Sequence, residues 1–318
     1  MRVSDADSNV VQLQIAARKF VPLLHKGPAI WLTAVSHIGE SNYFAALQRH
    51  LDQQTLVLFE GIGEHHARKV APAGGAPRTS GRPPVPTRTI SSKANRTSLQ
   101  SSMASSLGLA FQLEAIDYSR PNFQNSDLSI YELRQLMAEM RTAAGQEGAD
   151  QIFENLLKAM EGGSVLDSIL QLAMNFLGAS PKLQAMSKLV LIETISQMKG
   201  DPSELRGLPP QLTQLLEVLI DRRNQKVLAD LKSELEEFDN RNTIAIFYGT
   251  GHMPDLEMRL RRELNYQPVA QVWFNAFSVN LAETGISSSE LDFIRSFVNR
   301  EMEQFRSPKP SKQTNRQP

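Results

Sequence analysis

Short apolar runs near the two ends of the chain alternate with segments of helical periodicity. Three runs are continuously apolar: residues 30–35 (IWLTAV), 56–59 (LVLF) and 243–248 (TIAIFY). Such runs are typical of strands buried on both faces of a parallel sheet. Between the first two, residues 40–51 place Phe44, Leu47 and Leu51 at helical spacing. Strand, helix and strand in about 30 residues indicate a βαβ unit.

A similar unit follows the third run, with a helix predicted at 255–264, a strand at 269–277 and a last helix at 288–306. The predicted fold is therefore α/β, with a central, largely parallel sheet built from N- and C-terminal βαβ-like units around a large helical insertion. Four regions are expected: an α/β core (1–60 and 243–306), a flexible basic loop rich in Pro and Gly (61–97), a helical insertion or lid (98–238) and a disordered tail (307–318).

Composition narrows the classes of partner. The 318 residues are 41% hydrophobic and carry 34 basic and 34 acidic side chains, so no bulk charge favours nucleic acid or an anionic membrane. The chain has no cysteine, which excludes disulfides, thiolate metal sites and a cysteine nucleophile. No apolar run reaches the length of a membrane span. The first residues lack the apolar region of a signal peptide, which predicts a cytoplasmic protein, or an exported one if a segment precedes them. The oligomeric state is left open.

Three polar residues follow predicted strands. His37 comes just after the first apolar run, Glu60 ends the second, and His252 comes just after the third. Ligands of open parallel sheets bind outside the carboxyl ends of the strands. If the two units are neighbours in one sheet, these side chains converge on one crevice, where two imidazoles and a carboxylate suit a divalent metal, zinc included. Asn275 follows His252 at the spacing that separates Glu60 from His37, which indicates a structural pseudo-repeat.

Other interpretations stand beside the metal site. A lone histidine after a strand is usually a turn residue, and the chain has no HExxH, GxSxG, Walker A or GxGxxG motif. Gly249 and Gly251 permit positive φ and a close approach of backbone to His252. Arg223 either steadies a substrate carboxylate, orients Glu60 or is a surface arginine. The loop histidines His65 and His66 are expected to be exposed.

The motif residues resemble a known family. Ala34-Val-Ser-His37, the strand that ends in Glu60, and Gly249-Thr-Gly-His252 are similar to the two GxxH motifs and acidic residue of the TraB/PrgY, GumN and TIKI group. The first motif has Ala34 where the group has glycine. Arg223-Asn224 resembles the group's Arg-Asn or Arg-Asp element.

The resemblance implies an α/β fold related to erythromycin-esterase and ChaN-like proteins. For TIKI-type members it implies metal-dependent peptide hydrolysis with manganese or cobalt, and for TraB/PrgY-type members it implies inhibition of a peptide signal. Two functions are therefore expected. One is a metal-dependent, peptidase-like hydrolase with His37, His252 and Glu60 as metal ligands and with Glu60 and Arg223 in catalytic roles, Glu60 being either ligand or general base. The other is a non-catalytic protein that captures a peptide or small ligand in the same crevice.

Overall fold

The computed structural model describes residues 1–7, 9–24, 26–61, 107–144, 180–197 and 217–306. Its strands are β1 (Arg2–Asp7), β2 (Val10–Pro22), β3 (Ala29–Val35), β4 (Ile38–Gly39), β5 (Leu56–Phe59), β6 (Ala110–Phe111), β7 (Phe123–Asn125), β8 (Thr243–Gly249) and β9 (Tyr266–Asn280). Its helices are α1 (Ser41–Asp52), α3 (Gln112–Ala115), α4 (Ile130–Ala144), α7 (Pro181–Gln197), the π-helix η2 (Glu217–Arg222), α9 (Arg223–Glu237), the 3₁₀-helix η3 (Thr250–His252), α10 (Met253–Leu264), α11 (Leu281–Thr284) and α12 (Ser288–Arg306). Apart from Gly61, the predicted loop 61–97 lies outside the described residues, as does the tail 307–318.

One sheet holds the strands from both ends of the chain. Its order is β1-β2-β3-β8-β5-β7, with β9 paired to the other edge of β2. The strands β3, β8, β5 and β7 are parallel, whereas β2 pairs antiparallel with β1, β3 and β9. The predicted α/β fold with a central parallel sheet is confirmed. The strand expected at 269–277 is also present, but as part of a long antiparallel extension.

The parallel strands β3, β5 and β8 are largely apolar because both of their faces are covered. On β8, Ile244, Ile246 and Tyr248 belong to one hydrophobic cluster, while Ala245 and Phe247 belong to the cluster on the opposite face. All five side chains are fully buried. Successive side chains of a strand point to opposite faces, so a strand that is buried on both faces gives a continuous apolar run in the sequence.

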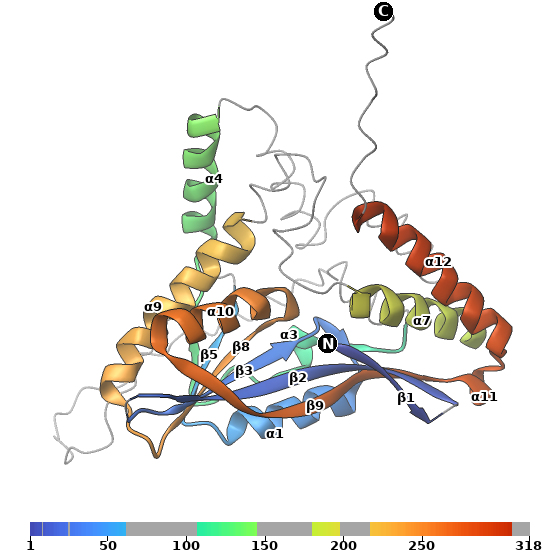
Figure 1. Ribbon diagram of the computed structural model, residues 1–318, viewed down its shortest axis with the longest axis horizontal. Coiled ribbons are helices and arrows are strands. Elements are labelled where there is room, and N and C mark those ends of the chain that lie inside the picture. Colours follow the sequence, from blue (N-terminus) through green and yellow to red (C-terminus); the bar gives the residue numbers. More distant parts are fainter. Residues whose placement is uncertain (8, 25, 62–106, 145–179, 198–216, 307–318) are drawn as a thin grey trace, which may run out of the picture.

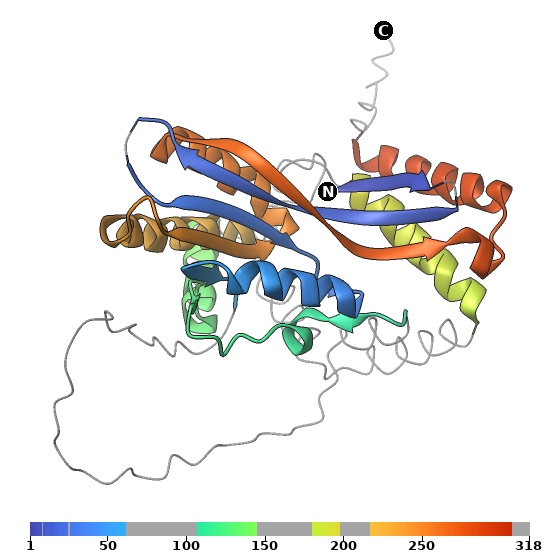
Figure 2. The ribbon, with the colours of Figure 1, turned by 90° about the horizontal axis from the view of Figure 1, so that it is seen from below.

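Helices from both halves of the chain form the outer layers. α9 and α10 lie above the sheet in Figure 1 and α1 lies below it, and the view from below in Figure 2 shows α1 running alongside the strands. On α9, Val227, Leu228 and Leu231 pack into the cluster with β3, β5 and β8. On α1, Phe44 and Leu47 pack into the opposite cluster. The carboxyl ends of the parallel strands are left between these layers.

In its described residues, the predicted helical stretch 98–238 contains helices and two unexpected short strands, β6, which pairs with β4, and β7. Within it, β7 adds to the sheet beside β5. The predicted capping box ahead of α4 is confirmed: Ser129 and Glu132 exchange hydrogen bonds between backbone N–H groups and side chains (3.2 and 2.7 Å). α9, expected in the lid, packs against the sheet instead. The insertion's residues 145–179 and 198–216 lie outside the described part of the chain.

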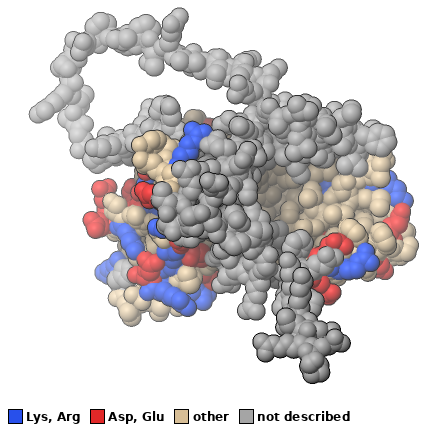
Figure 3. All heavy atoms as spheres, turned by 90° about the horizontal axis from the view of Figure 1, so that it is seen from above, with Lys and Arg blue, Asp and Glu red and all other residues tan. Residues whose placement is uncertain are grey.

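In the part of the chain that the structure describes, no helix combines the length and apolarity needed to cross a bilayer. On the face shown in Figure 3, acidic and basic side chains of the described residues lie intermingled. This mixture agrees with the equal numbers of basic and acidic residues in the sequence.

Candidate functional site

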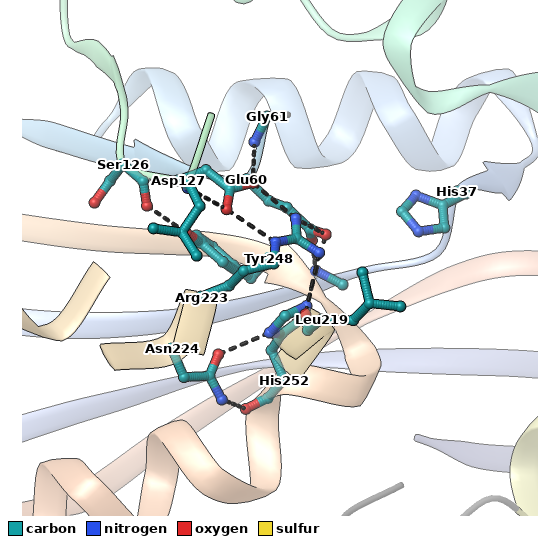
Figure 4. Close-up of polar contacts among 12 residues, drawn as sticks. His37, Glu60, Gly61, Ser126, Asp127, Leu219, Arg223, Asn224, Tyr248 and His252 are labelled. Atoms are coloured by element: carbon teal, nitrogen blue, oxygen red, sulfur yellow. Dashed lines mark hydrogen bonds and ion pairs between the residues drawn. The ribbon is translucent and has the colours of Figure 1, made fainter. Parts of the chain in front are cut away.

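The sheet order places three predicted site residues at the same edge. β8 lies between β3 and β5, and the register pairs Val35 with Gly249 and Phe59 with Phe247. His37, Glu60 and His252 therefore follow three adjacent parallel strands at their carboxyl ends. Figure 4 shows Glu60 and His252 close together, with the ring of His37 facing them from the side of β3.

Glu60 forms the centre of the site and is held through both carboxylate oxygens. Its Oε1 accepts a hydrogen bond from Nη2 of Arg223 (2.6 Å), and its Oε2 accepts one from the backbone N–H of Gly249 (2.6 Å). Burial alone raises the pKa of this carboxyl, but the Arg223 guanidinium and the imidazoles of His252 and His37 hold that pKa well below its ordinary range. The side chain is therefore a carboxylate at neutral pH. A base of such low pKa takes up protons poorly, so the electrostatics favour a ligand role over a general-base role.

Arg223 is buried rather than a surface arginine. Its side chain is 6% exposed, and besides Glu60 it donates from Nε and Nη2 to the two carboxylate oxygens of Asp127 (2.9 and 2.7 Å). Burial lowers the pKa of the guanidinium, but the two carboxylates outweigh burial and raise it above its ordinary value. Of the three roles considered for Arg223, the geometry favours orienting Glu60.

His252 is fixed by the residue that follows Arg223. Its Nδ1 lies 2.7 Å from Oδ1 of Asn224, while Nδ2 of Asn224 donates to Asp255 (2.8 Å) and to the carbonyl of His252 (3.3 Å). Because the amide nitrogen has two acceptors, the atom facing the imidazole is the amide oxygen. Nδ1 must then carry a hydrogen, which leaves the lone pair on Nε2 whenever the ring is neutral. That Nε2 lies 3.6 Å from Oε1 of Glu60, so a proton or a cation between the two atoms would relieve their repulsion.

His37 has the same arrangement on the opposite side. Its Nδ1 lies 3.0 Å from Oε1 of Gln112, and Nε2 of Gln112 donates to the hydroxyl of Tyr118 (2.9 Å). The backbone N–H of Gln112 also donates to the carbonyl of His37 (2.8 Å). With Nδ1–H donating to the amide, Nε2 is the nitrogen left to face the site. Histidine ligands of metals commonly donate their second ring N–H to such an acceptor.

Gly249 keeps the space between these groups open. A Cβ on this residue would lie 3.2 Å from Oε2 of Glu60, 3.8 Å from Cδ2 of His252 and 3.9 Å from Nε2 of His37. The φ of Gly249 is −53°, and neither Gly249 nor Gly251 is among the positive-φ glycines of the described chain. The conformational freedom of glycine is therefore not used at either position. Gly249 matters because it allows close approach, as it leaves a cradle lined by a carboxylate and two imidazoles.

The cradle has the donor set of a divalent-metal site, although its members are not gathered around one point. Among the described residues, no three His, Asp or Glu side chains lie close enough together to enclose an ion in this conformation. Glu60 and His252 form a close pair, and His37 lies across the cradle from them. The residues thus fit a metal by donor type, tautomer and open space.

One residue of the predicted pseudo-repeat does not belong to the site. Asn275 lies on the antiparallel strand β9 and accepts a hydrogen bond from Gln14 (2.7 Å), so the pseudo-repeat extends to the histidines but not to the acidic position. His65 and His66 lie outside the described residues. The hydroxyl of the buried Tyr248 donates to the carbonyl of Ser126.

Comparisons of the chain with protein-family models, with curated proteins and with solved structures give no match. The resemblance to the TraB/PrgY, GumN and TIKI group therefore remains a hypothesis that depends on the motif residues. The structure shows that the motif residues follow adjacent strands at one edge of the sheet.

Proposed function

We propose that this chain is a metal-dependent hydrolase, acting on a peptide or a related amide or ester bond, with His37, His252 and Glu60 as metal ligands. One observation carries the proposal: both imidazoles are held at Nδ1 by side-chain amides, and their Nε2 atoms face the cradle beside the Glu60 carboxylate. This tautomer and orientation suit histidines that bind a metal through Nε2.

The chain's own residues have distinct tasks in this proposal. Glu60 supplies negative charge, and its low pKa keeps it ionised in the pH range of most enzymes. Arg223 and the N–H of Gly249 fix the two oxygens of Glu60, so the carboxylate reaches the cradle without rotating. Asn224 holds the ring of His252. A bound divalent ion would supply Lewis acidity and would lower the pKa of a coordinated water toward neutrality.

The metal is proposed from the ligand types and from the resemblance. Two imidazoles and one carboxylate suit zinc as well as manganese or cobalt. The family resemblance favours manganese or cobalt. Metal content of protein purified without chelator distinguishes the three ions directly.

A second candidate is a metal-loaded binding protein that captures a peptide or small ligand without cleaving it. The observation that favours it is the engagement of both Glu60 oxygens together with the low pKa of this group, which makes Glu60 a poor general base. The two candidates share the metal site and differ in turnover.

The test combines metal binding with cleavage. Titration calorimetry with manganese, cobalt and zinc should show one site in the parent, and a peptide-library assay with the bound metal should show cleavage. His37→Ala and His252→Ala should each abolish metal binding while the fold is retained, and the double variant should be no worse than either single variant. His50→Gln is a matched control, since His50 packs against Trp31 away from the cradle.

Each outcome has a defined meaning. Metal bound by the parent without cleavage favours the binding protein. Parental affinity in either histidine variant rejects the shared site. Glu60→Gln separates the two roles of the carboxylate: lost metal identifies a ligand, and retained metal with lost turnover identifies a base.

A further inference from the structure

Asp127 is a buried carboxylate that the proposed chemistry does not use. It is fully buried and accepts four hydrogen bonds: two from Arg223 (2.9 and 2.7 Å) and one each from the backbone N–H groups of Gly61 (3.0 Å) and Leu128 (2.7 Å). All four partners are N–H donors, so both oxygens of this carboxyl group act as acceptors. The cluster thus contains two carboxylates, Glu60 and Asp127, with Arg223 between them.

The charge of this cluster decides how the cradle interacts with a cation. Arg223 contributes one positive charge and the two carboxylates contribute two negative charges, so the cluster carries one net negative charge when the imidazoles are neutral. Without Asp127, Arg223 would neutralise Glu60, and the cradle would have no net charge. The three side chains are 6%, 13% and 0% exposed for Arg223, Glu60 and Asp127, so solvent and salt screen these charges weakly.

Arg223 divides its donors in a way that fits this role. Nε and Nη2 both bond to Asp127, and only Nη2 also bonds to Glu60. A fork directed at one carboxylate is the stronger arginine pairing. The guanidinium is thereby matched mainly to Asp127, while Glu60 keeps lone pairs on the side of the cradle.

We infer that Asp127 is a positioning residue that compensates the charge of Arg223 and so keeps the cradle anionic and able to bind a divalent cation. The inference rests on the proposed function, because it concerns the affinity of the same site. It assigns Asp127 no contact with substrate or metal. Its effect passes through Arg223 and Glu60.

A purely structural role for Asp127 makes a different prediction. Its bonds to Gly61 and Leu128 also tie β5 to the segment after β7, so any change at Asp127 loosens local structure. The experiment must therefore separate charge from scaffolding. Variants that change both together do not decide between these roles.

The experiment measures the affinity for cobalt(II) alone by titration calorimetry in four proteins: the parent, Asp127→Asn, Asp127→Glu and the double variant Asp127→Asn/Arg223→Gln. Asp127→Asn should weaken cobalt binding by about 10- to 100-fold, the range typical of residues that support metal ligands. Asp127→Glu keeps the charge and should stay near the parental affinity. The double variant restores one net negative charge and should bind cobalt more tightly than Asp127→Asn. Circular dichroism and thermal unfolding check the fold of each protein.

Glu193→Gln is the matched control. Glu193 is a mostly buried carboxylate paired with Arg295 (2.8 Å) between α7 and α12, which Figure 1 shows on the side of the molecule away from α9. This variant should keep parental cobalt affinity. If Asp127→Asn does not fold, the double variant and Asp127→Glu are compared with the parent instead: both keep one net negative charge, so both should bind cobalt near the parental affinity, and folded proteins that both bind it far more weakly would overturn the inference.

Two other results would overturn the inference. One is a folded Asp127→Asn protein that binds cobalt as tightly as the parent, and the other is a double variant that binds no more tightly than Asp127→Asn. A parent protein that binds no divalent metal would instead reject the proposed function. The two failures are therefore distinguishable.

Discussion

Replacing Gly249 by alanine tests the cradle with a single methyl group. The backbone of Gly249 (φ −53°, ψ 148°) is a conformation that any residue adopts, so the substitution adds no backbone strain. The new Cβ would lie 3.2 Å from Oε2 of Glu60, closer than ordinary van der Waals contact. The same oxygen is held by the N–H of Gly249 at 2.6 Å. The Glu60 carboxylate would have to shift, although the backbone N–H of residue 249 that holds it stays in place.

The expected effect is large on metal binding and small on stability. The methyl group occupies space between the carboxylate and the two imidazoles, so metal affinity should fall at least about tenfold, equivalent to about 1.4 kcal/mol. Alanine restricts the unfolded chain and offsets part of the strain, so the free energy of unfolding should change by less than about 1 kcal/mol. Cobalt titration calorimetry measures the first quantity, and urea denaturation measures the second.

A second glycine provides the contrast. A Cβ on Gly39 would lie 2.5 Å from Cδ1 of Tyr43 and 3.0 Å from the carbonyl oxygen of Ala276, so Gly39→Ala should destabilise the fold by about 1–3 kcal/mol through overpacking. Parental cobalt affinity in a folded Gly249→Ala protein would refute the reasoning, since the space beside Gly249 would then not be ligand space.

Two further predictions concern histidines. Asn224→Leu removes the hydrogen-bond acceptor at Nδ1 of His252, so long-range ¹⁵N–¹H spectra at about pH 8 should show His252 moving from the Nδ1–H toward the Nε2–H tautomer. The control Asn224→Asp keeps an acceptor and should keep the parental tautomer. An unchanged spectrum in the leucine variant would contradict the assigned role of Asn224. Burial lowers the pKa of His50 below its ordinary value of 6.5. As the pH falls, the unfolded chain therefore binds a proton at His50 before the folded chain does, and the free energy of unfolding decreases below about pH 6.5. Between about pH 7 and 5, the free energy of unfolding should therefore decrease less in His50→Phe than in the parent, as measured by urea denaturation at each pH. An equal decrease in the two proteins would exclude this contribution of His50.

The parallel strands could be predicted because burial on both faces is visible in the sequence. The run 56–59 coincides with β5, and the runs 30–35 and 243–248 match β3 and β8 to within one residue at either end. Their adjacency was a condition of the site prediction, and the sheet order meets it. Residues at the carboxyl ends of such strands can therefore be found from sequence alone.

Strand pairing and the supporting polar residues could not be predicted in this way. β7 has three residues, too few to show a period, and the antiparallel pairing of β9 depends on contacts with β2 from the other end of the chain. Asp127 and Gln112 are polar residues in a stretch expected to be helical, where a solvated position is the usual interpretation. Their roles follow from tertiary contacts with Arg223 and His37. The neighbouring pair Arg223-Asn224 was the one signal in the sequence, through the family resemblance.

That pair links the two sides of the site. Consecutive residues of a helix point about 100° apart, and here one of them holds Glu60 while the next holds His252. Both lie in the first turn of α9, directly after the π-helix η2, and π-helical turns are often found at functional sites. A displacement of this turn would therefore disturb the carboxylate and the imidazole together. Because α9 is anchored to the sheet by Val227, Leu228 and Leu231, the geometry of the candidate site depends on the same packing that stabilises the fold.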